Sequence, residues 1–217
     1  KKAWKNKGLF KLSIKNKSKI TRNYSIATNP KFKDHLKFNV RLALPLNGSN
    51  NPPGLGSSYL FNLKKGDIVK LYGPFGDFHL KQTQKEIIFI GGGAGMAPFS
   101  SQISHLFETI KTKRKVSYWY GARSKKEIFY EDYFTLLDKK NDNFNFNLAL
   151  SEPLLEDQWK GHVGYIHEIV NKKYLNTMAD LSKIEFYLCG PPPMIKACRE
   201  MLRDVGVKNN QILFDAF

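Results

Sequence analysis

Cysteine is scarce in this sequence, and long apolar runs are missing. The 217 residues include two cysteines, Cys189 and Cys198, which are too few for a disulfide scaffold or a four-cysteine iron–sulfur site. No apolar run approaches the roughly 20 residues that a membrane-spanning helix needs. The first residues also lack the apolar stretch of a secretory signal. Because the sequence begins with Lys1 rather than Met, we expect it to be part of a longer chain.

Acidic residues are few relative to basic ones, 19 against 35, and the formal net charge is +16. Such a balance points to nucleic acid or to an anionic membrane surface. However, 29 of the basic residues are lysine and only 6 are arginine, whereas base reading and bidentate phosphate binding favour arginine. We therefore interpret the surplus as lysine on a solvated surface and expect no nucleic-acid partner. A basic nucleic-acid-binding module remains the alternative from another functional class.

The pattern of apolar residues changes near residue 84, which predicts two domains, 1–83 and 84–217. The first domain is expected to be an antiparallel β-barrel, incomplete at its N-terminal side, with strands at 21–28, 36–44 and 67–71 and a short helix at 57–63. The second alternates strands with helices, which predicts a doubly wound α/β parallel sheet covered on both faces. Its predicted strands are 86–90, 116–120, 144–150, 184–189 and 211–214, and its predicted helices are 98–111, 128–137, 165–170 and 192–204.

A glycine-rich stretch, residues 91–95, follows the first strand of the predicted parallel sheet and precedes a helix. Glycines let the main chain approach a pyrophosphate, and the free N–H groups at a helix start attract the anion. Pro98 suits the first helical turn. The usual G-x-G-x-x-G spacing is absent, since Met96 stands at the third glycine position. The stretch thus predicts a phosphate-binding loop, and a tight strand–helix turn without a ligand is the alternative.

A second loop, residues 189–194 (Cys-Gly-Pro-Pro-Pro-Met), ends a strand and opens a helix. We expect Cys189 to point outward at the carboxyl end of its strand, where open α/β sheets bind ligands. The alternative is a buried structural cysteine, the commonest fate of a free thiol.

Two weaker patterns lie in the first domain. For Arg22 and Tyr24 taken alone, a surface charge and a packing residue are the favoured interpretations. The stretch 54–59 precedes a short helix, so it is either a second anion site or a loop with a serine N-cap.

These motifs occur together and in order, from Arg22-x-Tyr24-Ser25 through the glycine loop, Tyr120-Gly-Ala-Arg123 and the Cys189 loop to a C-terminal aromatic residue. The set resembles the ferredoxin–NADP reductase superfamily. Within it, the sequence is most similar to the FAD- and NADH-binding part of the F subunits of sodium-translocating NADH:quinone reductases. The resemblance runs from about Thr21 to the end of the chain.

The resemblance implies an FAD site in the first domain and an NADH site in the second. The implied FAD-binding residues are Arg22, Tyr24, Ser25, Asn39, Val40, Arg41, Gly56, Ser57, Ser58 and Phe217. The implied NADH-binding residues are Gly92, Gly93, Ala94, Gly95, Met96, Arg123, Cys189, Gly190 and Pro191. Catalytic roles fall on Ser25 near flavin N5, Cys189 beside the nicotinamide and Phe217 over the flavin face. The basic residues after Tyr120 would also suit a 2′-phosphate, so the choice of NADH over NADPH rests on the resemblance.

The activity implied is that of a flavin-containing NADH dehydrogenase module. Hydride passes from NADH to FAD, and single electrons then pass to a [2Fe-2S] cluster and on to quinone in a sodium-pumping membrane complex. We expect the cluster and the membrane anchor in segments absent from this chain, other subunits as partners, and a place at the cytoplasmic face of the bacterial inner membrane.

Two alternatives concern the activity. A soluble flavin NAD(P)H reductase serving a ferredoxin or a monooxygenase shares the same motifs. A metal-dependent hydrolase has little support, because the five histidines form no ligand motif, and no metal site is expected.

Overall fold

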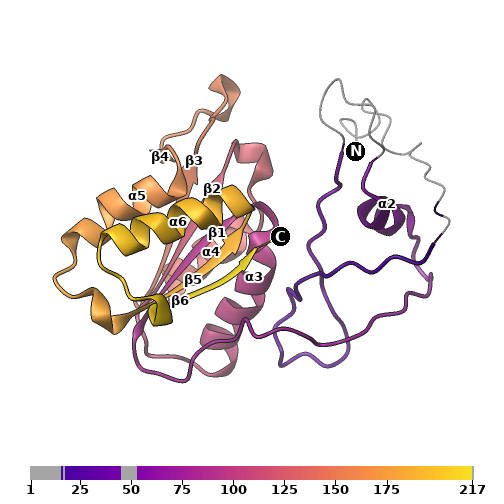
Figure 1. The fold of residues 1–217 in the computed structure, drawn as a ribbon, viewed down its shortest axis with the longest axis horizontal. Helices are drawn as coiled ribbons and strands as arrows, with labels where there is room; N and C mark the ends of the chain where they lie inside the picture. Colours follow the sequence, from indigo (N-terminus) through magenta and orange to yellow (C-terminus); the bar gives the residue numbers. More distant parts are fainter. Residues whose placement is uncertain (1–15, 17, 45–52, 217) are drawn as a thin grey trace. The chain divides into compact units, whose positions relative to one another are not determined.

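A computed structural model describes residues 16, 18–44 and 53–216, and they fall into two units (Figure 1). The first unit comprises Lys1–Ser25 and Phe38–Gly76, and the second comprises Ile26–Lys37 and Asp77–Phe217. The second unit is therefore built from two separate stretches of chain. The boundary expected between residues 83 and 84 remains a prediction.

In the described part of the first unit, helix α2 (Leu55–Asn62) is the regular element. The helix predicted at 57–63 is thus confirmed, with a start two residues earlier. The strands predicted at 21–28, 36–44 and 67–71 are not formed among the described residues: a main-chain hydrogen bond from Ala27 N–H to the Lys37 carbonyl (2.9 Å) joins the first two stretches, but no longer ladder follows. An extended stretch becomes a strand only when a neighbour takes up its N–H and C=O groups. Alternating apolar residues predict the extended backbone but do not supply that neighbour.

The second unit is built around a six-stranded, all-parallel sheet with the order β4-β3-β2-β1-β5-β6. Its strands are β1 (Glu86–Gly92), β2 (Val116–Ala122), β3 (Phe144–Leu150), β4 (His162–Val163), β5 (Ile184–Gly190) and β6 (Ile212–Ala216). The neighbouring strands β1 and β5, both inside the sheet, are buried along almost their whole length. Such continuous apolar strands need cover on both faces.

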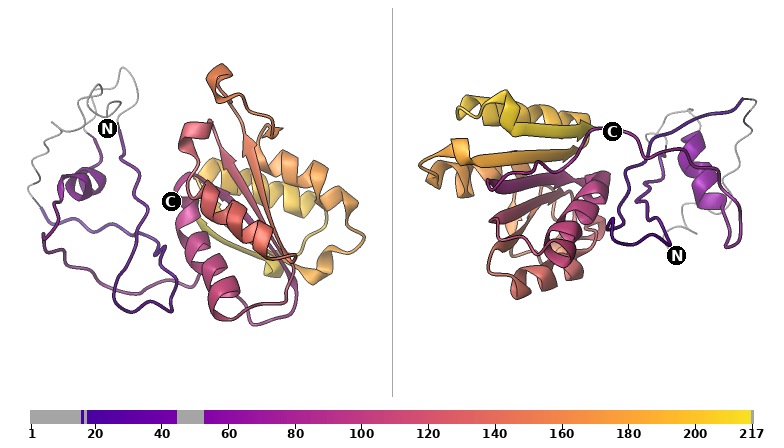
Figure 2. Two further views of the ribbon diagram at one scale, coloured as in Figure 1. Left: turned by 180° about the vertical axis from the view of Figure 1, so that it is seen from behind. Right: turned by 90° about the horizontal axis from the view of Figure 1, so that it is seen from below.

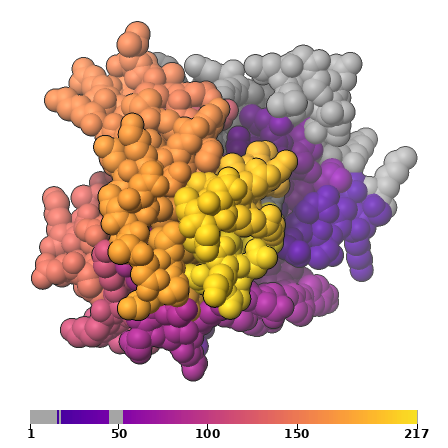
Figure 3. Space-filling view, turned by 60° about the vertical axis from the view of Figure 1, so that its left-hand side comes forward, coloured from indigo at the N-terminus to yellow at the C-terminus, as the bar shows by residue number. Residues whose placement is uncertain are grey.

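Two pairs of helices supply that cover. Helices α3 (Met96–Ser104) and α4 (Glu131–Lys140) pack on one face and form a core rich in aromatic rings (Figure 2, left). Helices α5 (Ile166–Lys173) and α6 (Pro192–Asp204) pack on the other face, where they lie side by side (Figures 1 and 3). The doubly wound sheet predicted from the alternating strands and helices is confirmed.

The predicted element boundaries differ from the structure where local backbone geometry intervenes. Helix α4 begins three residues later than predicted, since Tyr130 before it adopts φ 55°, a left-handed conformation that a regular helix does not allow. Helix α3 ends at Ser104 and continues as a π-helical turn, His105–Thr109. Strand β4 has two residues, too few for any alternation to reveal.

The segment 26–37 belongs to the second unit through contacts with α3 and the π-helical turn. Ser101 Oγ donates a hydrogen bond to the Thr28 carbonyl (2.7 Å), and Thr109 Oγ1 donates to Asn29 Oδ1 (3.1 Å). Lys31 pairs with Glu108 at 3.2 Å. These contacts hold an early stretch of sequence against the first helix of the parallel sheet.

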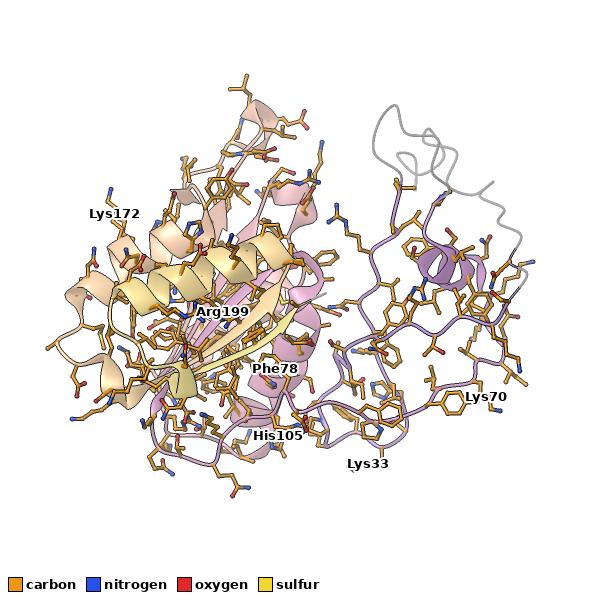
Figure 4. The ribbon with its side chains drawn as sticks, viewed as in Figure 1. Lys33, Lys70, Phe78, His105, Lys172 and Arg199 are labelled. Carbon is orange, nitrogen blue, oxygen red and sulfur yellow. The ribbon has the colours of Figure 1, made fainter. Side chains whose placement is uncertain are left out.

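The chain enters the sheet past Phe78, which is labelled in Figure 4. The Phe78 ring lies 6.1 Å from the rings of both Phe99 on α3 and Tyr187 on β5. Gln102 Nε2 donates to the Phe78 carbonyl at 2.9 Å. This stretch therefore joins the aromatic core before β1 begins.

Candidate functional site

The carboxyl ends of β1 and β5 lie side by side at the middle of the sheet. The chain winds from β1 outward through β2 and β3 on one side, then crosses back to β5 and β6 on the other. Gly91 is in register with Cys189, so the glycine loop and the Cys189 loop emerge next to each other. Open α/β sheets bind their ligands at such a switch in strand order. The two loops predicted separately from the sequence thus meet at one site.

The glycines there differ in what surrounds them, and Gly95 allows the two loops to touch each other. A Cβ at Gly95 would lie 2.0 Å from the carbonyl oxygen of Cys189. A Cβ at Gly92 or Gly190 would lie 2.5–2.6 Å from the end of the Met194 side chain. The sequence interpretation assigned these glycines to a ligand, whereas Gly95 is required by packing against the main chain of the Cys189 loop, and a Cβ at Gly92 or Gly190 would displace the flexible end of Met194.

Gly93 differs from the other glycines of the loop. Its φ is +56°, and a Cβ built there would meet nothing within 4 Å. Its main chain therefore faces open space one turn before α3, which starts at Met96. Helix starts carry free N–H groups and the positive end of the helix dipole. Gly93 and Ala94 accordingly present the main-chain surface that suits a pyrophosphate.

The side chains of Met96 and Cys189 are fully buried in the aromatic core. Tyr118 Oη donates a hydrogen bond to Met96 Sδ at 3.1 Å. Burial, and after it the charge of Asp215, raises the pKa of the Cys189 thiol well above its usual range. The outward orientation expected for Cys189 is therefore wrong, because helix α3 covers this end of β5. Because both side chains are buried, only the main chain of Met96 and Cys189 can contact a ligand.

Arg123 follows β2 and is paired with Glu127 in the same loop. Its Nε donates to Glu127 Oε1 at 3.1 Å and its Nη2 donates to the same oxygen at 2.6 Å. The Glu127 carboxylate raises the pKa of Arg123 further above its usual value. The Arg123 guanidinium, which the sequence predicts to bind a phosphate, thus forms an ion pair with a carboxylate of its own loop.

Tyr120 connects this loop to the glycine loop, and sequence analysis gave it no role. Its hydroxyl lies 3.2 Å from the Gly93 carbonyl and 3.4 Å from the Glu127 carbonyl. Burial, and after it the charge of Glu127, raises its pKa well above its usual value. The sequence feature that could have indicated this role is the position of Tyr120, directly before Gly121 at the end of a buried strand.

In the first unit, the implied FAD-binding residues gather around the start of α2. A Cβ at Gly56 would lie 2.9 Å from Arg22 Cγ and 3.1 Å from Tyr24 Oη, so both side chains lie directly against the helix start. Burial raises the pKa of Tyr24, and the charge of Arg22 opposes that shift. The structure thus brings together Arg22 and Tyr24, which sequence patterns alone assigned to surface charge and packing.

The two serines of this helix start differ in their hydrogen bonds. Ser57 Oγ donates to the Gly54 carbonyl and accepts from Ala43 N–H, each at 3.1 Å. Ser58 Oγ is buried and has no hydrogen-bond partner in the described part of the chain. An unpaired buried hydroxyl costs free energy unless a partner arrives. Ser58 therefore has the free donor that a phosphate oxygen requires, whereas Ser57 holds the loop.

The remaining implied site residues are placed as follows. Ser25, Asn39 and Val40 are half-buried and Arg41 is exposed, all in the first unit; Gly190 is buried, Pro191 is half-buried, and Phe217 lies outside the described residues. Their roles toward a cofactor remain predictions.

The described ranges offer neither a metal cluster nor a membrane span. No group of three or more His, Cys, Asp or Glu side chains suited to a metal ion occurs in them. No helix within the same ranges is long and apolar enough to cross a membrane.

Known families and relatives match both parts of the chain. Residues 8–80 match the oxidoreductase FAD-binding domain family, and residues 89–200 match the oxidoreductase NAD-binding domain family. The F subunit of the Na(+)-translocating NADH-quinone reductase of Marinomonas sp. is 45% identical over 215 residues, and that of Pseudomonas aeruginosa PAO1 is 46% identical over 214. Each alignment covers 99% of this chain and 53% of the relative. The chain therefore spans about half the length of the curated relatives it matches.

Solved structures share this fold. The ferredoxin reductase of carbazole 1,9a-dioxygenase superposes with a TM-score of 0.71 at 29% identity, covering 91% of this chain and 56% of that one. The cytochrome b5 reductase domain of Ulva prolifera nitrate reductase gives 0.77 at 22% identity, covering 90% and 77%; at that identity the likeness shows the fold alone. The chain belongs to the oxidoreductases of the ferredoxin reductase fold, in which an FAD-binding domain is joined to an NAD-binding domain.

Proposed function

We propose that this chain is the FAD- and NADH-binding module of the F subunit of a sodium-translocating NADH:quinone reductase. The observation that carries the proposal is the meeting of the glycine loop and the Cys189 loop at the switch point of the sheet, with Gly93 left open. The relatives named as F subunits, 45–46% identical over almost the whole chain, support the choice of this reductase within the wider family.

The residues of the first unit fit FAD. Arg22 would hold its pyrophosphate by charge-assisted hydrogen bonds, and the unpaired Ser58 hydroxyl would donate to a phosphate oxygen. Tyr24, which lies with Arg22 against the start of α2, would stack on the flavin, and Ser25 would hydrogen-bond near its N5. When bound, FAD supplies the two-electron acceptor for the hydride of NADH and can release electrons singly.

The residues of the second unit fit NADH as substrate. Gly93 and Ala94 would donate main-chain N–H groups to its pyrophosphate at the start of α3. The main chain of Cys189, Gly190 and Pro191 would position the nicotinamide. Because the Cys189 thiol is buried and its pKa is raised, it stays neutral and keeps charge and water away from that position.

The partners and the location follow from the same proposal. We place the [2Fe-2S] acceptor domain and the membrane anchor in the part of the relatives that this chain does not span, about half their length. The other subunits of the complex would be its partners, and the module would work at the cytoplasmic face of the inner membrane.

The test is anaerobic reduction of the flavin-loaded complete protein. NADH and, in a separate experiment, NADPH are added while the absorbance of oxidised flavin is followed. The proposal expects rapid bleaching by NADH and much slower bleaching by NADPH. Bound flavin that NADH does not bleach would contradict it. Efficient electron delivery to a ferredoxin, without quinone reduction in the assembled complex, would instead support the soluble reductase alternative.

A variant of Gly93 tests the nucleotide loop itself. Gly93→Asn tolerates the positive φ but adds a side chain on the open side, so we expect KM for NADH to rise about tenfold or more with FAD content unchanged, in line with a blocked phosphate site. Gly206→Asn is the matched control, because Gly206 also has a positive φ (+87°) and nothing within 4 Å of a built Cβ, but lies in the turn after α6. An unchanged KM in Gly93→Asn would place the pyrophosphate elsewhere.

A further inference from the structure

The sheet face that packs against α5 carries four hydrogen-bonding side chains on β2 and β3, where a covered parallel sheet usually carries apolar ones. Ser117 is in register with Asn145, and Trp119 is in register with Asn147. Because alternate residues of a strand point to the same face, the four side chains form two adjacent pairs. Trp119 packs in the core that α5 and α6 complete, so the pairs lie on that face of the sheet.

The four side chains line a hollow of about 330 Å³. His162 on β4 and the last turn of α5, with Lys173 and Tyr174, also border it. Tyr174 is fixed there, because Lys115 Nζ donates to its hydroxyl at 2.7 Å and the hydroxyl donates to Glu86. Ligand pockets have volumes of about 300–1,000 Å³. The hollow is therefore large enough for a small ligand.

Two groups that line the hollow are buried and lack a hydrogen bond. Ser117 is 1% exposed and Trp119 is 3% exposed. Neither Ser117 Oγ nor Trp119 Nε1 has a hydrogen-bond partner in the described part of the chain. Such groups cost free energy unless a partner arrives. Since an indole N–H can only donate, the partner it requires is an acceptor, such as a carboxylate oxygen.

Two opposite charges at the hollow are also unpaired. Lys173, the last residue of α5, and Asp138 on α4 both line it. Neither forms an ion pair or a side-chain hydrogen bond with another residue that the structure describes. The two charges cancel, which favours a ligand that carries one charge of each sign over a simple anion or cation. The nearby asparagine amides can both donate and accept.

The hollow is separate from the nucleotide loops. Ser117 and Asn145 are each the second residue of their strands, so the hollow begins near the amino ends of β2 and β3. The glycine loop and the Cys189 loop leave the carboxyl ends of β1 and β5. None of the residues that line the hollow belongs to those loops.

We propose that this hollow is a binding site for a small zwitterion of the amino-acid class. The ligand's carboxylate accepts hydrogen bonds from Trp119 Nε1 and Ser117 Oγ, on the side of Lys173. Its ammonium group faces Asp138, and the two asparagine amides face its side chain. Hydrogen bonds to charged groups are the stronger ones, so the charged ends of the ligand set its orientation.

The test follows the indole N–H signal of Trp119 by proton–nitrogen correlation NMR of the full chain. The probe is L-glutamine, whose side-chain amide complements the two asparagines. The sequence has three tryptophans, so Trp119→Phe assigns the signal. We expect a saturable downfield shift, because the indole N–H gains an acceptor, with a Kd of about 1 mM or lower.

Two analogues of the probe each lack one charge. L-Glutaminamide has no carboxylate, and glutaramate has no ammonium group. Each should bind at least about tenfold more weakly than L-glutamine, since each loses a charge-assisted contact. The absence of a saturable shift with L-glutamine would overturn the proposal. Equal affinity for L-glutamine and either analogue would overturn it too, because the site would then not recognise both charges.

Variants separate binding from folding. Ser117→Ala removes an unpaired buried hydroxyl, so the free energy of unfolding should stay the same or rise, while L-glutamine binding should weaken severalfold. Lys173→Met should also weaken binding. Its matched control is Lys172→Met, which removes the same charge from an exposed neighbour that does not line the hollow (Figure 4) and should leave Kd unchanged. Equal Kd values in the wild type, Ser117→Ala and Lys173→Met would place L-glutamine elsewhere and refute the site.

Discussion

Neighbouring glycines in one loop are required for different physical reasons. Gly93 adopts a positive φ and faces open space, whereas Gly95 is pressed against the main chain of the Cys189 loop. A substitution at Gly93 therefore tests conformation and ligand access. A substitution at Gly95 tests the contact between two loops.

Gly95→Ala should destabilise the second unit. The added methyl would lie 2.0 Å from the Cys189 carbonyl oxygen and 2.9 Å from Gly190 N, and both are main-chain atoms that have little room to move. Overpacking of this kind costs about 1–3 kcal/mol, occasionally more. Urea denaturation followed by circular dichroism measures the loss. Gly93→Asn is the control, with an expected change below about 1 kcal/mol because Asn accepts the left-handed region. Equal stability of Gly95→Ala and the wild type would show that the loops separate easily.

The residue scale also shows where sequence reasoning succeeds and fails. The glycine loop and the Cys189 loop were predicted as ligand loops from their residue types, and the strand order brings them together. The burial of Cys189 was not predicted, because the sequence does not show that helix α3 packs over the end of this strand. The pairing of Arg123 with Glu127 was also not predicted, although the two residues are only four apart, because the charges of a loop do not say which side chains contact each other.

At the scale of elements, sequence patterns predicted correctly those helices and strands whose ends are set by residues within the element itself. Strand β3 and helix α6 begin and end where predicted, since alternation and a leading proline mark them. The strands predicted at 21–28, 36–44 and 67–71 are not formed, because a strand requires a hydrogen-bonded neighbour and periodicity does not identify one. Strand β4, with two residues, and the π-helical turn after α3 are too short for a repeating pattern of apolar residues to reveal them.

Residues 81–85, which lead into β1, are held to the sheet by hydrogen bonds to a buried ion pair. Arg114 and Glu185 pair at 2.7 Å with side chains only 7% and 3% exposed. Arg114 also donates to the carbonyls of Lys81 and Lys85, and Thr83 Oγ1 donates to Glu185. The pair is thus the centre of a network that fixes residues 81–85.

Removing either charge of this network should be costly. Glu185→Leu leaves the Arg114 guanidinium buried without its counter-charge, so we expect a loss of about 3–5 kcal/mol in the free energy of unfolding. Arg114→Met should cost a similar amount, and the double variant should cost clearly less than the sum, as measured in a double-mutant cycle by urea denaturation. Lys126→Met, in an exposed pair, should change stability by at most about 1 kcal/mol. Strictly additive losses would mean that the network is not coupled.

At the scale of the whole molecule, the order of segments along the chain differs from their grouping in space. Residues 26–37 lie within the second unit although the chain on both sides of them belongs to the first. Ala27, Thr28 and Asn29 are buried, each at most 5% exposed. The early segment is therefore part of the fold of the NAD-binding unit and not only a connection between units.

Cutting the chain within the first unit should consequently leave two fragments that stay together. Residues 64–76 expose large apolar side chains, Ile68 at 95% and Phe75 at 85%, and poorly packed stretches of this kind are cleaved first. After a cut there, the fragment that contains 26–37 should remain bound to the fragment that begins near Asp77, because its contacts with Ser101, Glu108 and Thr109 are intact. Limited proteolysis followed by size-exclusion chromatography without denaturant should show both fragments in one peak.

Ala27→Asp provides the variant that separates this outcome from chance association. It places a charge at a buried position, 4% exposed, where desolvation opposes binding, so the nicked variant should separate into two peaks. Lys33→Asp, an exposed position in the same segment, makes a larger charge change and should leave the fragments together. If the nicked wild type separates as readily as nicked Ala27→Asp, the segment 26–37 is only tethered to the second unit through the chain. If it stays bound, the NAD-binding unit is a discontinuous fold, and a truncation that begins at residue 77 would remove part of it.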